Sequence, residues 1–590
     1  MEPLHAADLM IANPFMLSAL TPIEEAKLQL NARRINAAPV TGIGGDSERG
    51  ERGEGSERGE GEGRVVGAVT RQILDGALQH GLGDRPVEIV MEQDLGWIAP
   101  QAPAEEVGER MLSRHPRFIL VGDAREGRPL GIITRMQVLR YLQGKVGALE
   151  SRIDRRAARQ GESHEPVGDL LKRLPTLVLS RIERIASVSR RHGQPVYVVG
   201  GFVRDLLLGR ENRDLDLVAL GDGPHFARLL AEELGGTVKV HPAFLTAVVT
   251  DPDGLEIDVV TARSEFYRAP AALPEVQTSA LRQDLYRRDF TVNTLALCLG
   301  PEEAPELVDY FGGRQDLHDR ILRVLHSLSF LDDPTRALRA VRLELRLGFR
   351  IAPETARLIA VALSEGAFDR LSGSRLRDEL ALLLGETGLA VRGIERLGEL
   401  GLLAVLHPGL VLDEGARERL RQTRAALDWY RMEGLSQPPV AGWRLLLMAL
   451  AQDLPEAERA ALADRLLLAG EDRRLLTGFP ARLGAARRVL RRGSLAPHEA
   501  EEALAPLAGE ELLLLMAAED EACRAWVRRD LTAFRGLTLA IRGADLVTAG
   551  VPPGPRIGKA LSATRRARLD GRIEAEGELA FALATLGEGA

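Results

Sequence analysis

Hydrophobic and polar positions follow the same order twice near the start of the chain. Short apolar runs predict strands and amphipathic stretches predict helices, and the cores "VVGAVTRQIL" and "LGIITRMQVL" occupy matching places in the two copies. The pattern predicts two units of strand, helix, strand, strand and helix, over residues 1–85 and 86–145. A Gly/Glu/Arg/Ser-rich tract over 42–64 interrupts the first unit and predicts a flexible surface loop.

The periodicity changes twice along the rest of the chain. A charged segment over 146–190 predicts a helical linker, and 191–320 shows short apolar strands separated by glycine-rich turns, which is typical of an α+β domain. Apolar residues then recur at helical spacing, so we expect a helical neck over 321–385 and a helical body and tail over 386–590. The predicted fold class is multidomain, with an α/β pair of repeats, an α+β head and an all-α C-terminal part.

Composition favours a globular protein outside any membrane. The chain has 590 residues, 45% of them hydrophobic and 27% charged, with a formal net charge of −8. No apolar run reaches the ~18 residues that a membrane-spanning helix needs, and the N-terminus lacks the pattern of a secretory signal. The two cysteines lie in different segments and have no metal-site spacing. We therefore expect a cytoplasmic protein with no membrane partner.

Two acidic residues interrupt an apolar strand in the predicted head. In "RDLDLVAL", Asp214 and Asp216 are two residues apart, so both carboxylates point to one face of a strand. Asp258 alternates in the same way in "GLEIDVV" and could be their neighbour. Carboxylates on one face repel unless a cation lies between them, and Mg²⁺ prefers such oxygen ligands. The structural alternative is that the pair bonds to Arg204 or Arg213.

Two further segments carry residues suited to binding a nucleotide. The stretch "PVYVVGG" predicts a strand that ends in a Gly200–Gly201 turn before a short helix, where backbone N–H groups can bind a phosphate. Many structural turns share that sequence. Further along, "LRQDLYRRDFTVN" places Arg288, Asp289 and Asn293 at the edge of the same site.

A basic helix follows the predicted head. In "DDPTRALRAVR", Asp333 before Pro334 predicts a helix N-cap with proline at the first helical position. Arg336, Arg339 and Arg342 recur every three residues and form one stripe on that helix. A solvated helix face is the simplest interpretation of such a stripe. Its position after the acidic pair favours contacts with a triphosphate or a base.

Five ordered motifs carry a resemblance to a known family: "GGFVRDLLLGRENRDLDLV", "IDVVTARSEFY", "RRDFTVNTLA", "DYFGGRQDLHDRILRVL" and "DDPTRALRAVRLELRLGF". Together they resemble the class II tRNA nucleotidyltransferase and bacterial poly(A) polymerase superfamily, with its polymerase-beta-like head, from about Val196 to Gly348. The repeats upstream resemble tandem CBS domains. A bacterial subgroup combines the two, and its longer members also carry a phosphoesterase-like DHH domain, which is not expected in this chain.

The resemblance implies a role for each motif residue. Asp214 and Asp216 would hold two Mg²⁺ ions, with Asp258 as the third catalytic acid. The other implied contacts are all with the nucleotide: Gly201, Arg204 and Arg288 with the triphosphate, Asp289 near the ribose, Asp333 and Arg336 on the Watson–Crick edge of the base, and Arg339 and Arg342 in support. Gly200 and Asn293 complete the predicted nucleotide-binding residues.

Two departures from the family pattern leave the preferred base open. The family often shows Glu-Asp before the proline, where this chain has Asp332–Asp333, and Asn-Ala after the RRD motif, where this chain has Asn293–Thr294. Neither change removes an implied ligand.

The implied activity is template-independent addition to the 3′ end of tRNA, which the helical body would bind. The enzyme would add CCA or only its final A, using ATP, and CTP in the first case, with release of pyrophosphate. A poly(A) polymerase acting on other RNA and a CBS-type nucleotide-sensing regulator with a silent transferase domain are the alternatives. In the CBS family an Asp commonly binds ribose where this chain has Ile73 and Gln137. That difference favours a structural or homodimer-forming role for the pair.

Overall fold

The structure is a computed structural model with two compact units, Met1–Leu371 and Ser372–Ala590. It describes residues 4–42, 64–93, 95–113, 118–124, 127–134, 137–138, 167–266, 275–278, 280–300, 305–517 and 521–587. Residues 43–63 of the predicted low-complexity loop and residues 146–166 of the predicted linker lie outside the described residues. The domain boundaries predicted inside each unit stay predictions.

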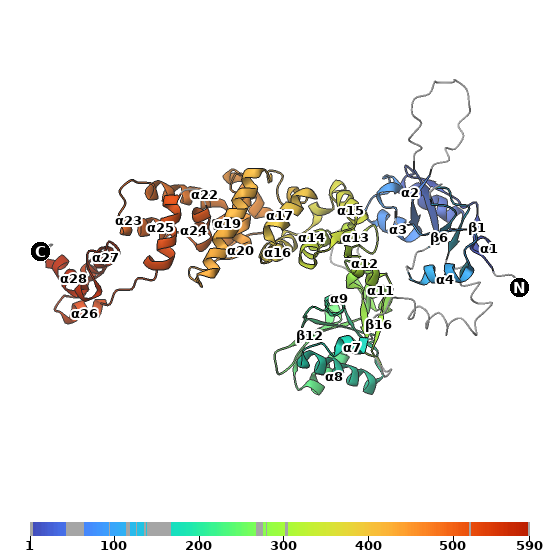
Figure 1. Ribbon diagram of the computed structural model, residues 1–590, viewed down its shortest axis with the longest axis horizontal. Coiled ribbons are helices and arrows are strands. Elements are labelled where there is room, and N and C mark those ends of the chain that lie inside the picture. The colour runs from blue at the N-terminus through green and yellow to red at the C-terminus, as the bar shows by residue number, and fades with distance from the viewer. Residues whose placement is uncertain are drawn as a thin grey trace, which may run out of the picture. The chain divides into compact units, whose positions relative to one another are not determined.

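Two small sheets form the N-terminal part of the first unit (Figure 1). The first repeat runs through β2 (Leu17–Ser18), α2 (Ile23–Ala32), β3 (Ala37–Thr41), β4 (Val65–Thr70) and α3 (Arg71–Gln79). The second repeat runs through β5 (Trp97–Ile98), α4 (Ala104–Ser113), β6 (Phe118–Val121) and β7 (Gly131–Thr134). The predicted order of elements therefore occurs in both repeats, although the last helix expected in the second lies largely outside the described residues.

The N-terminal strand joins the sheet of the other repeat. After α1 (Ala6–Leu9), β1 (Ile11–Ala12) pairs antiparallel with β7, and the second sheet has the order β1-β7-β6-β5. The first sheet has the order β2-β3-β4. The pairing of β1 with β7 therefore links the start of the chain to the second repeat. The short helix η1 (Val87–Ile89) lies on the segment that connects the two repeats.

A seven-stranded sheet with the order β10-β11-β12-β9-β8-β15-β16 forms the head. Its strands are β8 (Val196–Val199), β9 (Leu215–Ala219), β10 (Thr237–His241), β11 (Thr246–Thr250), β12 (Glu256–Thr261), β15 (Ala296–Cys298) and β16 (Glu306–Val308). In β9 the alternation predicted from sequence is present, because Leu215 and Leu217 are fully buried while Asp216 is half-buried. Hydrophobic residues on the buried face stabilise the sheet, and the carboxylate of Asp216 lies on the opposite face.

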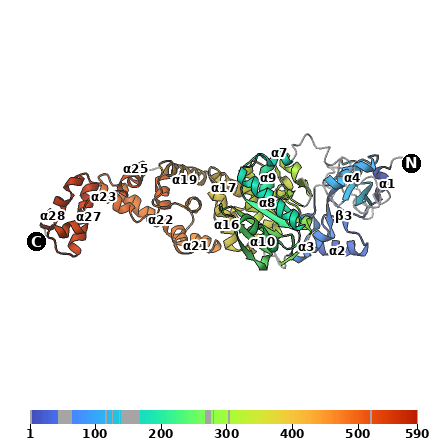
Figure 2. The same cartoon turned by 90° about the horizontal axis from the view of Figure 1, so that it is seen from below.

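Helices and a small hairpin surround the head sheet. Helix α10 (Gly223–Leu234) packs on β11 and β12, and α8 (Thr176–His192) lies beside it (Figure 2). The remaining elements of the head are α7 (Val167–Leu171), α9 (Gly201–Leu207), η2 (Pro242–Phe244), β13 (Arg263–Phe266), β14 (Glu275–Thr278), α11 (Leu281–Tyr286), η3 (Thr291–Asn293) and α12 (Gly313–His318).

The neck begins where β17 (Ile321–Leu322) pairs in parallel with β18 (Arg350–Ile351). Between them lie α13 (Ser329–Asp332) and α14 (Thr335–Leu347), and α15 (Pro353–Ser364) and η4 (Ala367–Arg370) follow. Helix α14 buries Ala337, Leu338, Ala340 and Val341 on one face. This face anchors the helix that carries the arginine stripe.

The start of α14 differs from the prediction by one residue. We expected Asp333 as N-cap and Pro334 as the first helical residue, but Pro334 is the N-cap and Asp333 is the C-cap of α13, with extended backbone. The reason is that α13 ends immediately before Asp333 and leaves it between two helices. Its Oδ1 still accepts a hydrogen bond from the backbone N–H of Thr335 (3.1 Å), so it satisfies an amide of the first turn.

The second unit is entirely helical in its described residues. Its helices are α16 (Gly373–Gly385), α17 (Ala390–Glu399), α18 (Leu403–Leu406), α19 (Glu414–Met432), α20 (Gly442–Leu450), α21 (Glu456–Arg465), α22 (Gly470–Leu490), α23 (Pro497–Leu504), α24 (Gly509–Ala517), α25 (Glu521–Arg529), η5 (Asp530–Phe534), α26 (Gly543–Thr548), α27 (Pro555–Leu569), η6 (Ala575–Gly577) and α28 (Glu578–Gly587).

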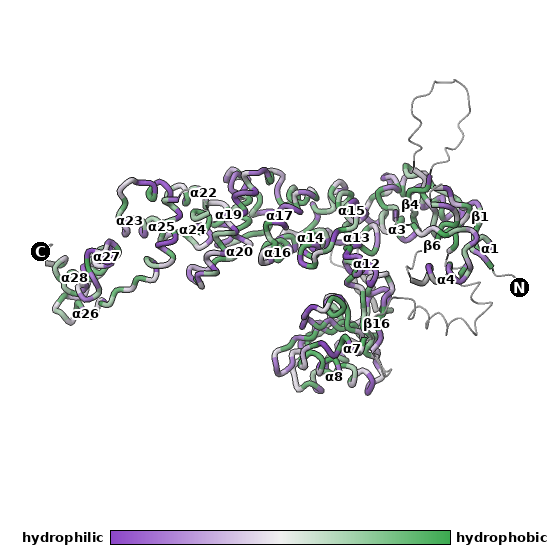
Figure 3. Tube along the Cα trace, in the orientation of Figure 1, coloured by the Kyte–Doolittle hydropathy of each residue, from purple (hydrophilic) through white to green (hydrophobic). Residues whose placement is uncertain are grey.

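Apolar and charged segments alternate along these helices (Figure 3). The core includes Leu445–Leu450 of α20, all buried, and two buried glutamates of α24. Arg444 Nε donates to Glu510 Oε1 (3.0 Å) and Arg482 Nε donates to Glu511 Oε1 (2.5 Å), so arginines satisfy both carboxylates. In the part of the chain that the structure describes, no helix is both long enough and apolar enough to cross a membrane.

Candidate active site

Three carboxylates meet where β9 and β12 run side by side. The two strands are parallel and Asp258 lies opposite Asp216 in their register. Asp214 immediately precedes β9, and one oxygen atom from each of the three side chains lies within 4.8 Å of the others. The structure thus brings together the acidic pair and the third acid that the sequence suggested as its neighbour. We call these three residues the acidic triad.

Electrostatic repulsion in the acidic triad favours a bound cation. The pKa of Asp216 is raised to about 6, first by burial and also by the charges of Asp214 and Asp258, while the Arg288 guanidinium acts in the opposite direction. The pKa of Asp258 is also raised, first by burial and then by Asp214 and Glu256. One guanidinium does not balance three carboxylates, and an all-oxygen donor set of this kind fits Mg²⁺.

Magnesium should therefore stabilise the folded protein in a pH-dependent way. Asp216 binds its proton more tightly in the folded state, at a pKa of about 6, than in the unfolded state, at 3.8. Its contribution to stability is thus lost as pH rises from about 4 to 6, because the charged form is disfavoured in the fold. We expect 10 mM MgCl₂ to raise the melting temperature by about 2 °C or more at pH 7.5 and by less at pH 5, where protons compete. Differential scanning fluorimetry measures both, and an equal rise in Asp214→Asn would contradict the assignment.

A buried hydrogen-bond network connects the head to α14. Arg204 forms a two-pronged pair with Asp205 (both contacts 2.9 Å), and its Nη1 donates to Asn293 Oδ1 (2.7 Å). Asn293 Nδ2 donates to Asp289 Oδ1 (2.9 Å), and Arg339 Nη2 lies 2.9 Å from Asp289 Oδ2. Four predicted site residues thus belong to one network. The alternative in which Arg204 neutralises the acidic pair is wrong, because Arg204 pairs with Asp205.

Asp289 is held in its ionised form by this network. Burial alone would raise its pKa, but Arg339, the hydrogen bond from Asn293 and Arg336 outweigh burial and leave the pKa below its ordinary value. The buried carboxylate therefore keeps its charge at neutral pH, which would allow it to accept hydrogen bonds from a bound ligand.

Sequence reasoning missed Asp205 and Asn212. Asn212 Nδ2 donates to Asp205 Oδ2 (2.8 Å), and its Oδ1 accepts from the backbone N–H of Asp214 (2.8 Å). These two residues therefore link the network to the loop that carries the first member of the acidic triad. No spacing rule indicates this link, since Asn212 lies in an irregular segment; only the direct adjacency of Arg204 and Asp205 hinted at a pair.

Asp284 was also missed, and it fixes the position of two arginines. Its side chain is fully buried, with Arg287 Nη2 2.7 Å from Oδ1 and Arg288 Nη2 3.5 Å from Oδ2. Asp284 precedes these residues by three and four positions, the spacing at which side chains meet on a helix. That spacing in "LRQDLYRRD" could have identified Asp284 as the residue that orients Arg288.

The Gly200–Gly201 turn lies against Arg288 and the acidic triad. Gly200 has φ +77°, and a Cβ atom there would lie 3.1 Å from Arg288 Nη1 and 3.4 Å from Asp216 Oδ2. Helix α9 starts at Gly201. A side chain at position 200 would thus occupy the space next to the arginine and the acid.

We expect Gly200→Ala to reduce activity by about tenfold or more. The added Cβ atom would displace Arg288, which would then no longer hold its ligand in the position needed for reaction. Strain at positive φ should also lower the free energy of unfolding by ~1–2 kcal/mol. Gly209→Ala is the matched control, because Gly209 has φ +65° with nothing within 4 Å of a Cβ. Urea denaturation and steady-state rates separate the effects, and equal activity loss in both variants would show that strain alone is responsible.

Two members of the arginine stripe of α14, Arg336 and Arg339, bind other side-chain or backbone groups. Arg336 is only 6% exposed. Its Nη1 donates to Ser329 Oγ (2.7 Å) and its Nη2 to the Arg287 carbonyl (2.6 Å). Arg339 pairs with Asp289, and Arg342 follows one turn later, half-buried. Arg336 and Arg339 therefore bind the head from the neck.

In the N-terminal repeats, the residues at the two positions that depart from the CBS pattern contact groups within their own repeat. Ile73 is buried at 2% exposure, and Thr70 Oγ1 accepts from its backbone N–H (3.3 Å). Gln137 Oε1 accepts from the backbone N–H of Thr134 (3.1 Å). Neither position offers the carboxylate that would hold a ribose.

Three known families match parts of the chain. The Poly A polymerase head domain matches residues 196–323, and the probable RNA and SrmB-binding site of polymerase A matches 348–412. The CBS domain matches 87–144, within the second repeat. These matches coincide with the head that carries the acidic triad, the segment that follows α14, and one N-terminal repeat.

Curated relatives identify the family. The CC-adding tRNA nucleotidyltransferase of Deinococcus radiodurans is 37% identical over 370 residues, which is 61% of this chain and 89% of the relative. This chain belongs to the tRNA nucleotidyltransferase family. The A-adding tRNA nucleotidyltransferase of Geobacter sulfurreducens is 37% identical over 574 residues, 96% of this chain. The chain spans 63% of that relative's length.

Solved structures of the family share the fold. The Thermotoga maritima CCA-adding enzyme complexed with tRNA is 30% identical, with a TM-score of 0.58 over 72% of this chain and 99% of that chain. The similarity supports a mixed α/β head followed by a large helical part, as predicted from the sequence.

Proposed function

We propose that this protein adds the terminal adenosine to the 3′ end of tRNA, without a nucleic-acid template, using ATP and releasing pyrophosphate. The observation that carries the proposal is the acidic triad beside Arg288. The extent of similarity to an A-adding enzyme, 96% of this chain, favours a single A over complete CCA addition, which would also use CTP.

The triad and the glycine turn would perform the transfer. Mg²⁺ held by Asp214 and Asp216, with Asp258 completing the site, would lower the pKa of the RNA 3′-hydroxyl and neutralise triphosphate charge. Arg288 and the backbone of the Gly200–Gly201 turn orient the triphosphate. The RNA 3′-oxygen then attacks the α-phosphate in line and pyrophosphate leaves, with charge building on oxygens that Arg288 faces.

The neck helix would read the base. Asp333 offers acceptors and Arg336 offers donors to a Watson–Crick edge, which is how side chains could replace a template. Ser329 and the Arg287 carbonyl fix the Arg336 guanidinium, so its direction is set before the nucleotide arrives. Arg342, the next arginine of the stripe, would support the base-reading residues or the phosphates.

Asp289 would lie near the ribose and help to select a ribonucleotide. Its ionised carboxylate can accept from a ribose hydroxyl. Asn293, oriented by Arg204, and Arg339 of α14 hold it. We propose that Arg204 acts through Asn293 in this way. The sugar and the base would thus be read by one connected set of side chains.

We also propose that the N-terminal repeats form a homodimer. Large apolar side chains are exposed there, including Leu4, Ile11, Leu20, Leu28 and Leu130, each at least 45% exposed. Apolar surface of this kind favours association. Multi-angle light scattering of the full chain should give twice the chain mass, and a monomer at micromolar concentration would contradict the dimer.

Product length on two RNAs tests the proposed activity. One substrate is a tRNA transcript ending in CC, and the other is an unstructured RNA of equal length with the same last two nucleotides. With ATP and Mg²⁺ we expect one added nucleotide on the tRNA and little on the other RNA. Long tails on both would instead identify a poly(A) polymerase, and no extension of either would overturn the proposal.

A further inference from the structure

The first N-terminal repeat contacts the segment that leads into the base-reading helix. Helix α3 approaches it so closely that a Cβ atom at Gly76 would lie 2.5 Å from Leu328 Cδ1. Leu328 immediately precedes α13. His80, the C-cap of α3, follows one turn after Gly76 and therefore lies over the same segment.

His80 makes a buried hydrogen bond to Asp332, the last residue of α13. The distance from Nε2 to Asp332 Oδ1 is 2.8 Å, and only 5% of the histidine side chain is exposed. Burial would raise the pKa of Asp332, but the hydrogen bond with His80 and the charges of His326, His80 and Arg336 hold it below its ordinary range. The carboxylate is ionised and can only accept, so His80 Nε2 is the donor.

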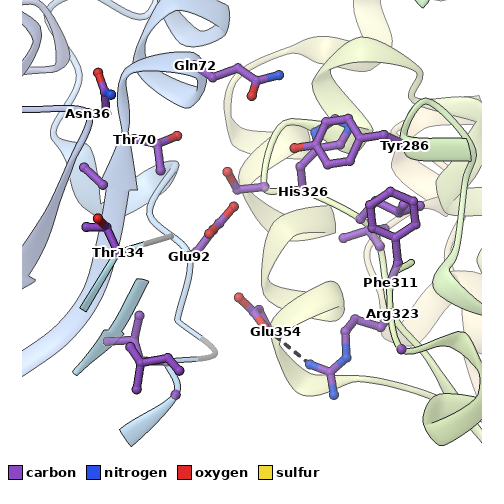
Figure 4. A pocket seen from close by; sticks show the side chains of 18 of the residues that line it. Asn36, Thr70, Gln72, Glu92, Thr134, Tyr286, Phe311, Arg323, His326 and Glu354 are labelled. Atoms are coloured by element: carbon purple, nitrogen blue, oxygen red, sulfur yellow. Dashed lines mark ion pairs between the residues drawn. The ribbon is translucent and has the colours of Figure 1, made fainter. Parts of the chain in front are cut away.

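A second histidine approaches the same carboxylate from the neck. His326 Nε2 lies 3.7 Å from Asp332 Oδ2, and the ring of His326 lies 5.1 Å from that of Tyr286. Both rings line a cavity between the repeats and the neck, facing Thr70 and Gln72 (Figure 4). Asp332 is therefore held between one group from the first repeat and one from the neck.

The position of Asp332 sets the position of the base-reading residues. Helix α13 has four residues and is too short to be rigid by itself. Ser329 at its start binds Arg336 (2.7 Å), and the backbone N–H of Asp333 donates to the Ser329 carbonyl (3.1 Å). A shift of α13 at Asp332 would therefore move both Asp333 and Arg336.

Other contacts hold the end of the first repeat, at Arg85, and the segment that connects the two repeats on the neck without involving Asp332. Arg85 pairs with Glu365, and the backbone N–H of Gln93 donates to Glu354 Oε1 (3.0 Å). Arg357 donates to the carbonyls of Glu88 and Met91, both at 3.3 Å. Loss of His80 alone should thus leave the repeat in place.

We infer that His80 is a positioning residue for nucleotide selection: its hydrogen bond to Asp332 fixes the turn that presents Asp333 and Arg336 to the base. The inference rests on the proposed function of those two residues. In this role the first repeat influences which nucleotide is selected, and it does so without binding a nucleotide itself.

Calorimetric binding of ATP and CTP to the full chain with Mg²⁺ tests this role, because no RNA is present and nothing is transferred. We expect His80→Ala to reduce the ratio of CTP to ATP dissociation constants by about tenfold, near the lower end of the loss expected for a hydrogen bond to a charged group. His80→Gln should retain most of the ratio, since its amide can donate to Asp332. Arg85→Ala, which removes a docking contact elsewhere, should leave the ratio unchanged.

Three results would overturn the inference, and the Asp333→Ala and Arg85→Ala variants tell them apart. A wild-type ratio in His80→Ala together with an altered ratio in Asp333→Ala shows that His80 has no positioning role. A wild-type ratio in both shows that the base-reading assignment itself fails. Equal loss in His80→Ala and Arg85→Ala would attribute the effect to docking and not to the hydrogen bond. Melting temperatures confirm that each variant is folded.

Discussion

Replacing Asp214 with alanine lowers kcat/KM for nucleotide addition by about 1,000-fold or more, which corresponds to ~4 kcal/mol of transition-state stabilisation. The acidic triad would hold the cations that activate the 3′-hydroxyl and the triphosphate, and it loses one of its three carboxylates. A rate assay on a tRNA ending in CC, with labelled ATP, measures the fall. Because Asp214 raises the pKa of its buried neighbour Asp216, the metal-free variant should be at least as stable as the wild type.

Glu211→Gln is the control for loss of charge in the same loop. Glu211 is exposed, three residues before Asp214, and lies outside the acidic triad. We expect its activity to stay within about twofold of wild type, as is usual for surface sites. Comparable losses of kcat/KM in Asp214→Ala and Glu211→Gln would mean that activity depends on the total charge of the loop and not on the acidic triad.

Replacing Arg288 with alanine lowers kcat/KM by about 100-fold, the cost expected when a preorganised donor to the transition state is removed. It also moves the acid limb of the pH–rate profile to higher pH. The Arg288 guanidinium opposes the rise in the pKa of Asp216, which is about 6 in its presence. Without that charge the pKa of Asp216 rises further, so a larger fraction is protonated near neutral pH.

Arg288→Lys separates the two effects. Lysine keeps the charge, so the pH profile should stay close to wild type while part of the rate is lost with the planar donor geometry. Arg282→Ala, which changes an arginine of the preceding helix α11 that lies over the Phe311 ring (5.8 Å), should leave both unchanged. An unshifted pH profile in Arg288→Ala would contradict the placement of Arg288 beside the triad.

Local patterns predicted the strands of the head and the order of elements in the repeats. Leu215 and Leu217 alternate with Asp216, and this period identifies both the strand and its polar face. That Asp258 lies opposite Asp216 depends on the parallel pairing of β12 with β9, which the sequence made plausible but could not fix. The sequence therefore indicated which three residues could form the triad, and the structure shows that they lie together.

Long-range contacts were not predictable from the sequence. His80 and Asp332 are 252 residues apart, and β1 joins the sheet of the other repeat. Neither contact has a local pattern, because side chains from distant segments meet only after the fold forms. The network around Asp205 was missed for a related reason, since the Asn212 that links it to Asp214 lies in an irregular loop.

The central proposal is that this protein adds one A to the CC end of tRNA. The most direct test is extension of three tRNA transcripts, lacking A, CA or CCA, with Mg²⁺ and labelled ATP or CTP, and with an Asp214→Ala/Asp216→Ala variant as control. We predict one A on the transcript that ends in CC, no incorporation of CTP on any transcript, and no product from the variant. Ordered addition of C, C and A would contradict the claim of A-only addition, and equal inactivity of wild type and variant on all three would contradict the transferase account.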